Sequence, residues 1–184
     1  MMTITVIKGF PDDTRNSSDN FVDKLCEQLI LKGVEIKYHD LKKRSVKNCI
    51  GCFGCWVKTP GECTVPDDSI QIRRDAINSG LIIFVSPVIM GFTSALLKNV
   101  QDKMIPLIHP YIEFVNNECH HQSRYDKYPD IALILDKTED SDEEDYKIIK
   151  HIYQRLAINM KANMRFLAFT DQPIEEVIYE INGN

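Results

Sequence analysis

Two kinds of apolar pattern alternate along the chain. Short runs of consecutive apolar, often β-branched residues predict buried β-strands, and longer segments with apolar residues every three or four positions predict amphipathic helices. Strands are expected at 3–7, 81–85, 131–135 and 164–169, and also at 34–38, where apolar and polar residues alternate. Helices are expected at about 18–33, 69–80, 93–104, 141–159 and 174–181.

This alternation of strands and helices predicts an α/β fold with parallel strands, right-handed crossovers and helices on both faces of the sheet. The run 81–85 contains no polar position, as expected for a central strand covered on both faces. We expect a single domain over 1–184, with a loop at 43–66 and an irregular insertion at 105–130. Ligands of such sheets bind beyond the carboxyl ends of the strands, where the loops 9–17, 41–69, 86–92 and 136–141 emerge.

Composition narrows the function classes. The 184 residues carry a net charge of −5, which argues against a nucleic-acid-binding surface. The most continuous apolar run is too short to cross a bilayer, and the first residues lack the features of a signal peptide, so a cytoplasmic protein is expected. The anomaly is cysteine: the chain has six, and four of them lie within fifteen residues.

Those four cysteines, Cys49, Cys52, Cys55 and Cys63, have the spacing C-x2-C-x2-C-x7-C. Thiolates are the ligands of iron–sulfur clusters, and short spacers allow neighbouring thiolates to converge on one centre. A zinc site and unliganded or redox-active thiols remain alternatives, whereas a disulfide framework is disfavoured in a cytosolic chain. Cys26 lies on the apolar face of the first helix and is expected in the core.

The loop 9–20 joins the first strand to the first helix. Helix N-termini present free N–H groups and bind phosphate readily, and Arg15, Ser17, Ser18 and Asn20 add hydrogen-bonding side chains. The loop has neither the glycine-rich dinucleotide fingerprint nor a Walker sequence. The alternative interpretation is a polar turn in which Ser17 or Ser18 caps the helix.

The cysteine loop followed by Asp67-Asp68, the segment from Ser86 through Gly91, and the pairs Leu97-Lys98 and Asp102-Lys103 resemble the NAD(P)H-dependent FMN reductases. Within that group the cysteine spacing is most similar to the iron–sulfur flavoprotein branch. The resemblance covers roughly residues 1–105 and implies a flavodoxin-like three-layer sandwich with five parallel strands in the order 2-1-3-4-5. The sequence departs from the family pattern at Phe10, at Ile89 and in the acidic segment 136–140.

The resemblance also implies cofactors and site residues. Arg15, Ser17, Ser18 and Asn20 would hold the FMN phosphate, and the four cysteines Cys49, Cys52, Cys55 and Cys63 would hold a [4Fe–4S] cluster. The segment after the third strand would surround the ribityl chain and the isoalloxazine through Ser86, Pro87, Val88, Ile89, Met90, Gly91 and Thr93. No catalytic acid or base is assigned, because the cofactors carry the chemistry.

The expected function is an FMN-dependent oxidoreductase that relays electrons between FMN and the cluster. The alternatives are a flavin-poor redox-sensing or metal-binding module and a cluster-free NAD(P)H-dependent quinone or FMN reductase. The expected partners are an electron donor such as NAD(P)H or a small redox protein and further copies of the chain in a homodimer or homotetramer, without nucleic acid or membrane. The insertion 105–130 holds three of the five histidines and is a candidate for the subunit contact or for covering a neighbour's flavin.

Overall fold

The computed structural model describes residues 2–11 and 16–183, without the side chains of 16, 17 and 19. Five parallel strands form the sheet in the order β2-β1-β3-β7-β8, which confirms the predicted order 2-1-3-4-5. A short strand not expected from the sequence, β4, pairs antiparallel with β3. The strands are β1 (Thr3–Lys8), β2 (Glu35–Asp40), β3 (Leu81–Ile89), β4 (Phe92–Thr93), β7 (Asp130–Asp136) and β8 (Met164–Phe169).

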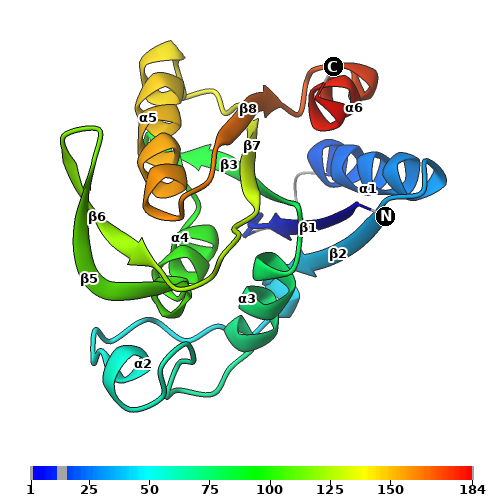
Figure 1. Cartoon of the computed structure of the whole chain (residues 1–184). Helices are drawn as coiled ribbons and strands as arrows, with labels where there is room; N and C mark the ends of the chain where they lie inside the picture. The colour runs from blue at the N-terminus through cyan, green and yellow to red at the C-terminus, as the bar shows by residue number, and fades with distance from the viewer. Residues whose placement is uncertain (1, 12–15, 184) are drawn as a thin grey trace.

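Helices cover both faces of this sheet (Figure 1). One buried apolar cluster joins α1 (Asn16–Leu31) and α6 (Ile174–Asn182) to one face. A second cluster joins the other face to α3 (Ser69–Ile77), α4 (Ala95–Asp102) and α5 (Glu143–Asn159). The apolar run of β3 is buried from Leu81 to Val88, as expected for a central strand. No helix among the described residues is long and apolar enough to span a membrane.

The end of β3 and the start of α5 differ from the expected boundaries. β3 continues through Ile89, so part of the expected loop 86–92 is strand. α5 is capped by Asp142, which forms a capping box with Asp145. A Ser141–Glu144 box would start the helix one residue earlier, but the Ser141 hydroxyl donates instead to the Thr138 carbonyl oxygen at 2.9 Å.

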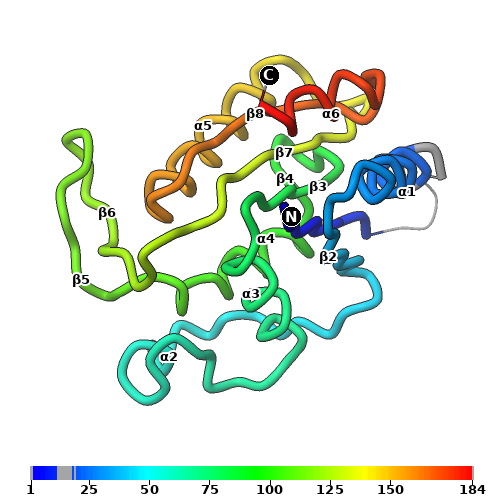
Figure 2. Tube along the Cα trace, turned by 45° about the vertical axis from the view of Figure 1, so that its right-hand side comes forward, coloured from blue at the N-terminus to red at the C-terminus, as the bar shows by residue number. Residues whose placement is uncertain are grey.

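The insertion 105–130, expected to be irregular, contains an antiparallel hairpin. After the 3-10 turn η2 (Ile105–Leu107), β5 (Ile108–Val115) pairs with β6 (Glu118–Ser123). Asn116 and Asn117 form the turn with positive φ angles of 51° and 64°, which asparagine adopts more readily than most residues. Figures 1 and 2 show the hairpin extending away from the sheet, beside α5.

The cysteine loop also has some regular structure. It follows the 3-10 turn η1 (Leu41–Lys43) and contains one short helix, α2 (Gly54–Val57). Two hydrogen bonds close its base: the Lys47 N–H donates to Asp67 at 3.0 Å and the Ser45 N–H donates to Asp68 at 2.7 Å. The loop therefore leaves the body of the protein through a narrow neck and lies below α3 in Figure 1.

Candidate functional site

The carboxyl ends of β1, β3 and β7 lie side by side. Lys8 at the end of β1 pairs with Val85, and Pro87 near the end of β3 pairs with Asp136. Parallel strands place their following loops at one edge, so the start of α1, the β3–β4 turn and the 136–141 segment meet there. This edge is the candidate flavin site.

Ser18, in the first turn of α1, is hydrogen-bonded to another part of the protein. The buried Ser18 hydroxyl donates to the Asp136 carboxylate at 2.6 Å, and the Thr170 hydroxyl donates to the same oxygen at 2.6 Å. Asn20 is exposed, whereas Arg15 and the side chain of Ser17 lie outside the described residues. The expectation that Ser17 or Ser18 caps the helix is wrong, because α1 begins at Asn16 and both serines lie inside it. Ser18 instead connects α1 to β7.

The β3–β4 turn exposes an apolar surface at the same edge. Met90 and Gly91 form this two-residue turn with φ angles of 50° and 71°. The turn leaves Met90 99% exposed and Ile89 40% exposed, although neighbouring parts of β3 are buried. The remaining residues of the expected flavin segment are buried: Ser86, Pro87, Val88 and Thr93.

Ser86 supports the turn from inside. Its hydroxyl donates to the Pro87 carbonyl oxygen at 2.9 Å and accepts a bond from the Ser94 N–H at 2.8 Å. Ser94 in turn caps α4, because its hydroxyl accepts from the Leu97 N–H at 3.2 Å. The structure therefore divides the expected flavin segment into an exposed tip and a buried support.

All four cysteines of the loop line one small pocket of about 30 Å³, together with Lys103. Gly54 lies against its wall, where a Cβ would come within 2.6 Å of a methyl carbon of Thr64. Phe53 and Gly51 both have positive φ angles, 53° and 65°, which turn the chain sharply between the cysteines. Among the described residues, no three cysteine, histidine or carboxylate side chains stand at metal-binding separations. The pocket gathers the thiols without fixing them as a coordination shell.

The thiols in this pocket differ in acidity. The Gly54 N–H and the Thr64 hydroxyl stabilise the thiolate of Cys52 and lower the pKa of its thiol. Burial raises the pKa of the Cys55 thiol, and the nearby sulfur of Cys63 raises it further. Two like charges close together disfavour ionisation, so the full set of thiolates requires a cation at the centre.

Lys103 links this pocket to the core. Its ammonium lies 2.9 Å from the Asp67 carboxylate, and both side chains are 1% exposed. The same ammonium donates to the sulfur of Cys63 at 3.4 Å. Burial alone would lower the pKa of Lys103, but the bonds to Asp67 and Cys63 outweigh it and raise the pKa. Asp67 and Lys103 lack a local sequence signal as part of the cysteine site, because they meet only when α4 packs against the loop.

Trp56 connects the loop to the hairpin. Its ring stacks on Phe53, with centroids 5.3 Å apart, and also contacts the His121 ring at 5.2 Å. The indole N–H donates to the Ile108 carbonyl oxygen at 2.9 Å. The hairpin thus supports the outer side of the cysteine loop.

Curated proteins with sequences similar to this chain include two iron–sulfur flavoproteins. Iron–sulfur flavoproteins of Archaeoglobus fulgidus and Methanocaldococcus jannaschii are 30% identical over 103 residues and 31% identical over 106 residues. Those matches cover 56% and 58% of this chain but 46% and 53% of the relatives. The chain therefore spans about half the length of the curated relatives it matches.

Solved structures share the fold. The NAD(P)H:quinone oxidoreductase of Methanothermobacter marburgensis has a TM-score of 0.62 at 13% identity, covering 98% of this chain and 93% of that one. The FMN-dependent NADH-azoreductase of Bacillus anthracis, solved with FMN, has a TM-score of 0.62 at 12% identity and the same coverage of both chains. The sequence itself matches the NADPH-dependent FMN reductase family over residues 2–117, which is more than half of its length. The chain belongs to the NADPH-dependent FMN reductase family.

Proposed function

We propose that the protein is an FMN-dependent oxidoreductase that passes electrons between FMN and a [4Fe–4S] cluster in the cysteine loop. The observation that carries the proposal is the gathering of Cys49, Cys52, Cys55 and Cys63 around one pocket in a chain of this reductase family. The names of the two iron–sulfur flavoproteins it resembles support the same assignment.

FMN would lie at the carboxyl edge of the sheet. The start of α1, with Arg15, Ser17, Ser18 and Asn20, would receive the phosphate, and the exposed tip at Ile89 would contact the ring. Bound FMN accepts a hydride and releases single electrons, whereas an iron–sulfur cluster carries one electron at a time. The 99% exposure of Met90 supports a ligand at this turn, because an unshielded apolar tip gains from being covered.

The cluster would be held by the four thiolates. Its charge fits the pocket, because the buried ammonium of Lys103 already contacts the sulfur of Cys63 at 3.4 Å. The hydrogen bonds that lower the pKa of Cys52 also favour the thiolate form that binds iron. The chain thus supplies four thiolate ligands for a cationic cluster core, and the Lys103 ammonium and the Gly54 N–H stabilise the negative charge on two of the sulfurs.

Two other functions each have one observation in their favour. A cluster-free NAD(P)H-dependent quinone or FMN reductase is consistent with thiols that, among the described residues, do not reach metal-binding separations. A flavin-poor redox sensor is consistent with the bond from Ser18 to Asp136, which engages a hydroxyl expected to meet the phosphate. The experiment below separates all three.

We further propose an electron donor such as NAD(P)H or a small redox protein, and assembly into a homodimer or homotetramer. The hairpin is the proposed contact between copies, because Phe114 is 79% exposed and Tyr111 is 65% exposed on it. Replacing Phe114 with serine should then reduce the molar mass measured by light scattering. An unchanged mass would contradict this contact.

The test is anaerobic purification followed by assays of FMN, iron and acid-labile sulfide per chain. The Cys52→Ser variant should keep FMN and lose most of its iron. Cys119→Ser, which changes an exposed thiol on the hairpin, should keep both and serves as the matched control. A colourless protein that takes up no FMN would contradict the flavin assignment. A Cys52→Ser variant with its full iron content would contradict the cluster.

A further inference from the structure

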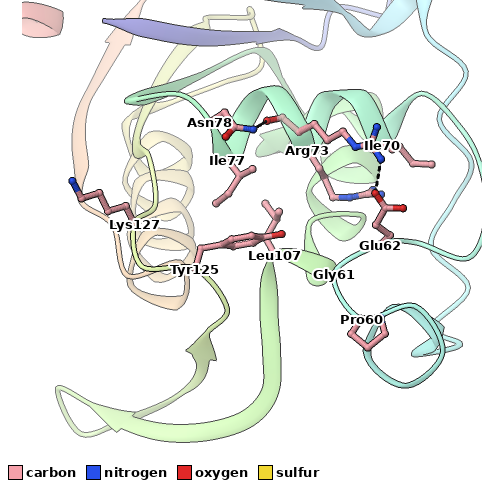
Figure 3. Close-up of a pocket in the computed structure, with 11 residues that line it drawn as sticks. Pro60, Gly61, Glu62, Ile70, Arg73, Ile77, Asn78, Leu107, Tyr125 and Lys127 are labelled. Carbon is pink, nitrogen blue, oxygen red and sulfur yellow. Dashed lines mark hydrogen bonds and ion pairs between the residues drawn. The ribbon is translucent and has the colours of Figure 1, made fainter.

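A cavity of about 460 Å³ lies along one face of α3, away from the flavin edge and outside the cysteine pocket. We propose that this cavity binds a small planar aromatic anion, such as an aromatic carboxylate. Figure 3 shows its walls: α3 on one side, Leu107 and Tyr125 on the other, and Glu62 of the cysteine loop at one end. The volume is within the range of ordinary small-molecule sites.

The cavity is separate from the proposed flavin site. Its lining follows α3 along nearly its whole length, from Ile70 to Asn78, and includes none of the flavin candidates. Gly80, two residues later, donates its N–H to the Thr3 carbonyl oxygen at 2.9 Å, at the amino end of β1. The flavin candidates lie at the opposite, carboxyl edge of the sheet. A ligand in this cavity would therefore not compete with FMN for space.

The charges that line the cavity favour an anion. The described residues that line the cavity include three basic residues, Arg73, Arg74 and Lys127, and one acidic residue, Glu62. The lining therefore carries a net charge of +2. Glu62 is already paired with Arg74 at 2.6 Å. Arg73 lies at the Glu62 end of the cavity, and Lys127 lies at the opposite end with its ammonium directed outward (Figure 3).

Arg73 is held in place. Its side chain is buried at 4% exposure, and its guanidinium donates to the Ser69 hydroxyl at 2.8 Å and to the Lys103 carbonyl oxygen at 3.0 Å. These two bonds orient the guanidinium, and the nearby Asp67 carboxylate and Cys63 thiol favour its charged form. A fixed guanidinium is well suited to a carboxylate, because its planar donors match the two oxygens.

The rest of the lining suits a flat apolar ring. Tyr125 lies across from α3, with its ring beside Leu107 and below Ile77 (Figure 3). Its ring also meets the Tyr128 ring edge-on at a centroid distance of 6.0 Å, which supports it from behind. Aromatic rings prefer offset or edge-on contacts with other aromatic rings, so an aromatic ligand gains at Tyr125 beyond the area it buries.

The test uses 2-naphthoate as the probe and the neutral 2-naphthalenemethanol as its comparator, titrated calorimetrically into the full chain saturated with FMN. We expect one 2-naphthoate per chain and roughly tenfold or weaker binding of the neutral compound, because it lacks the charged hydrogen bonds. Lys127→Glu and Tyr125→Ala should each weaken 2-naphthoate binding several-fold. Lys150→Glu, an equal charge change at an exposed position of α5, should not.

Three results would overturn the proposal. The first is an absence of saturable 2-naphthoate binding to a folded protein. The second is equal affinity for the acid and the alcohol. The third is binding that neither Lys127→Glu nor Tyr125→Ala changes. Circular dichroism of each variant checks that the fold is intact, and Tyr125→Phe, which retains the ring, should bind 2-naphthoate nearly as well as the parent. None of these outcomes depends on whether the cysteines hold a cluster.

Discussion

Replacing Lys103 with methionine should destabilise the protein strongly. The change removes the ammonium from its position 2.9 Å from Asp67 and leaves that carboxylate buried at 1% exposure. Methionine is similar in length and fills the space, so the main cost is an uncompensated buried charge rather than a cavity. The contact with Cys63 at 3.4 Å is lost as well.

The magnitude follows from the remaining partners of Asp67. Breaking a buried pair by removing one ion costs about 3–5 kcal/mol. Asp67 still accepts from the Lys47 N–H at 3.0 Å and the Ser69 N–H at 2.9 Å, which places the cost near the lower limit, at about 3 kcal/mol. The exposed pair of Lys98 and Asp102, with 48% exposure on each side, provides the matched comparison. Lys98→Met should cost less than about 1 kcal/mol.

Urea unfolding followed by circular dichroism measures both variants. With a slope of about 3 kcal/mol per molar urea, Lys103→Met should lower the midpoint by roughly 1 M. Adding Asp67→Asn to Lys103→Met should recover part of the loss, because the buried charge is then gone. Equal midpoints for Lys103→Met and Lys98→Met, or a double variant less stable than Lys103→Met alone, would contradict the cost assigned to the buried charge.

Three further predictions follow from other parts of the structure. Burial lowers the pKa of His39 below its ordinary value of 6.5, so stability should fall as the pH drops through 6.5, and His39→Gln should flatten that part of the urea-midpoint profile; parallel profiles would contradict this. In metal-free protein at neutral pH, iodoacetamide should modify Cys52 before Cys26, because the pKa of the Cys52 thiol is lowered whereas burial raises that of Cys26 to about 12. Mass spectrometry of peptides measures the order, and earlier modification of Cys26 would contradict these acidities. Gly54→Ala should cost about 1–3 kcal/mol of stability, because its Cβ would overlap Thr64, and a parent-like urea midpoint would show that the loop relaxes freely.

The main elements of the fold were predictable because β1, β3 and β7, the three central strands of the sheet, are buried along most of their length. β3 and β7 are apolar along nearly their whole length, so their positions can be read directly from the sequence. The hairpin was not predicted because few residues of β5 and β6 are buried, and buried and exposed residues do not alternate regularly along them. Helix starts depend on single hydrogen bonds, so the cap of α5 at Asp142 rather than Ser141 required the structure.

The cysteine pocket was predictable in outline for a similar reason. The spacing of Cys49, Cys52 and Cys55 is local, and local spacing limits how far apart the sulfurs can lie. The contacts that surround it join distant parts of the chain and leave no pattern in the sequence. The bond from Lys103 to Cys63 spans 40 residues and requires α4 to pack on the loop. The same holds at the flavin edge, where the bond from Ser18 to Asp136 spans 118 residues.

The departure at Phe10 also has a structural reason. Its side chain is fully buried in the cluster beneath α1, so this position supports the helix rather than facing a phosphate. The acidic segment 136–140 is likewise partly structural, because Asp136, the last residue of β7, accepts bonds from Ser18 and Thr170. Sequence alone does not show whether a residue that departs from the family pattern packs in the core or contacts a ligand.

The relay between FMN and the cysteine loop is tested most directly by reducing the anaerobic, FMN- and iron-loaded protein with NADPH in a rapid-mixing experiment. Flavin absorbance and the electron paramagnetic resonance of the cluster are followed in the same samples. A relay from FMN to the cluster predicts that the flavin bleaches first and that a reduced-cluster signal then appears, in the parent and in Cys119→Ser but not in Cys52→Ser. Complete flavin reduction with no cluster signal in the iron-loaded parent would contradict it.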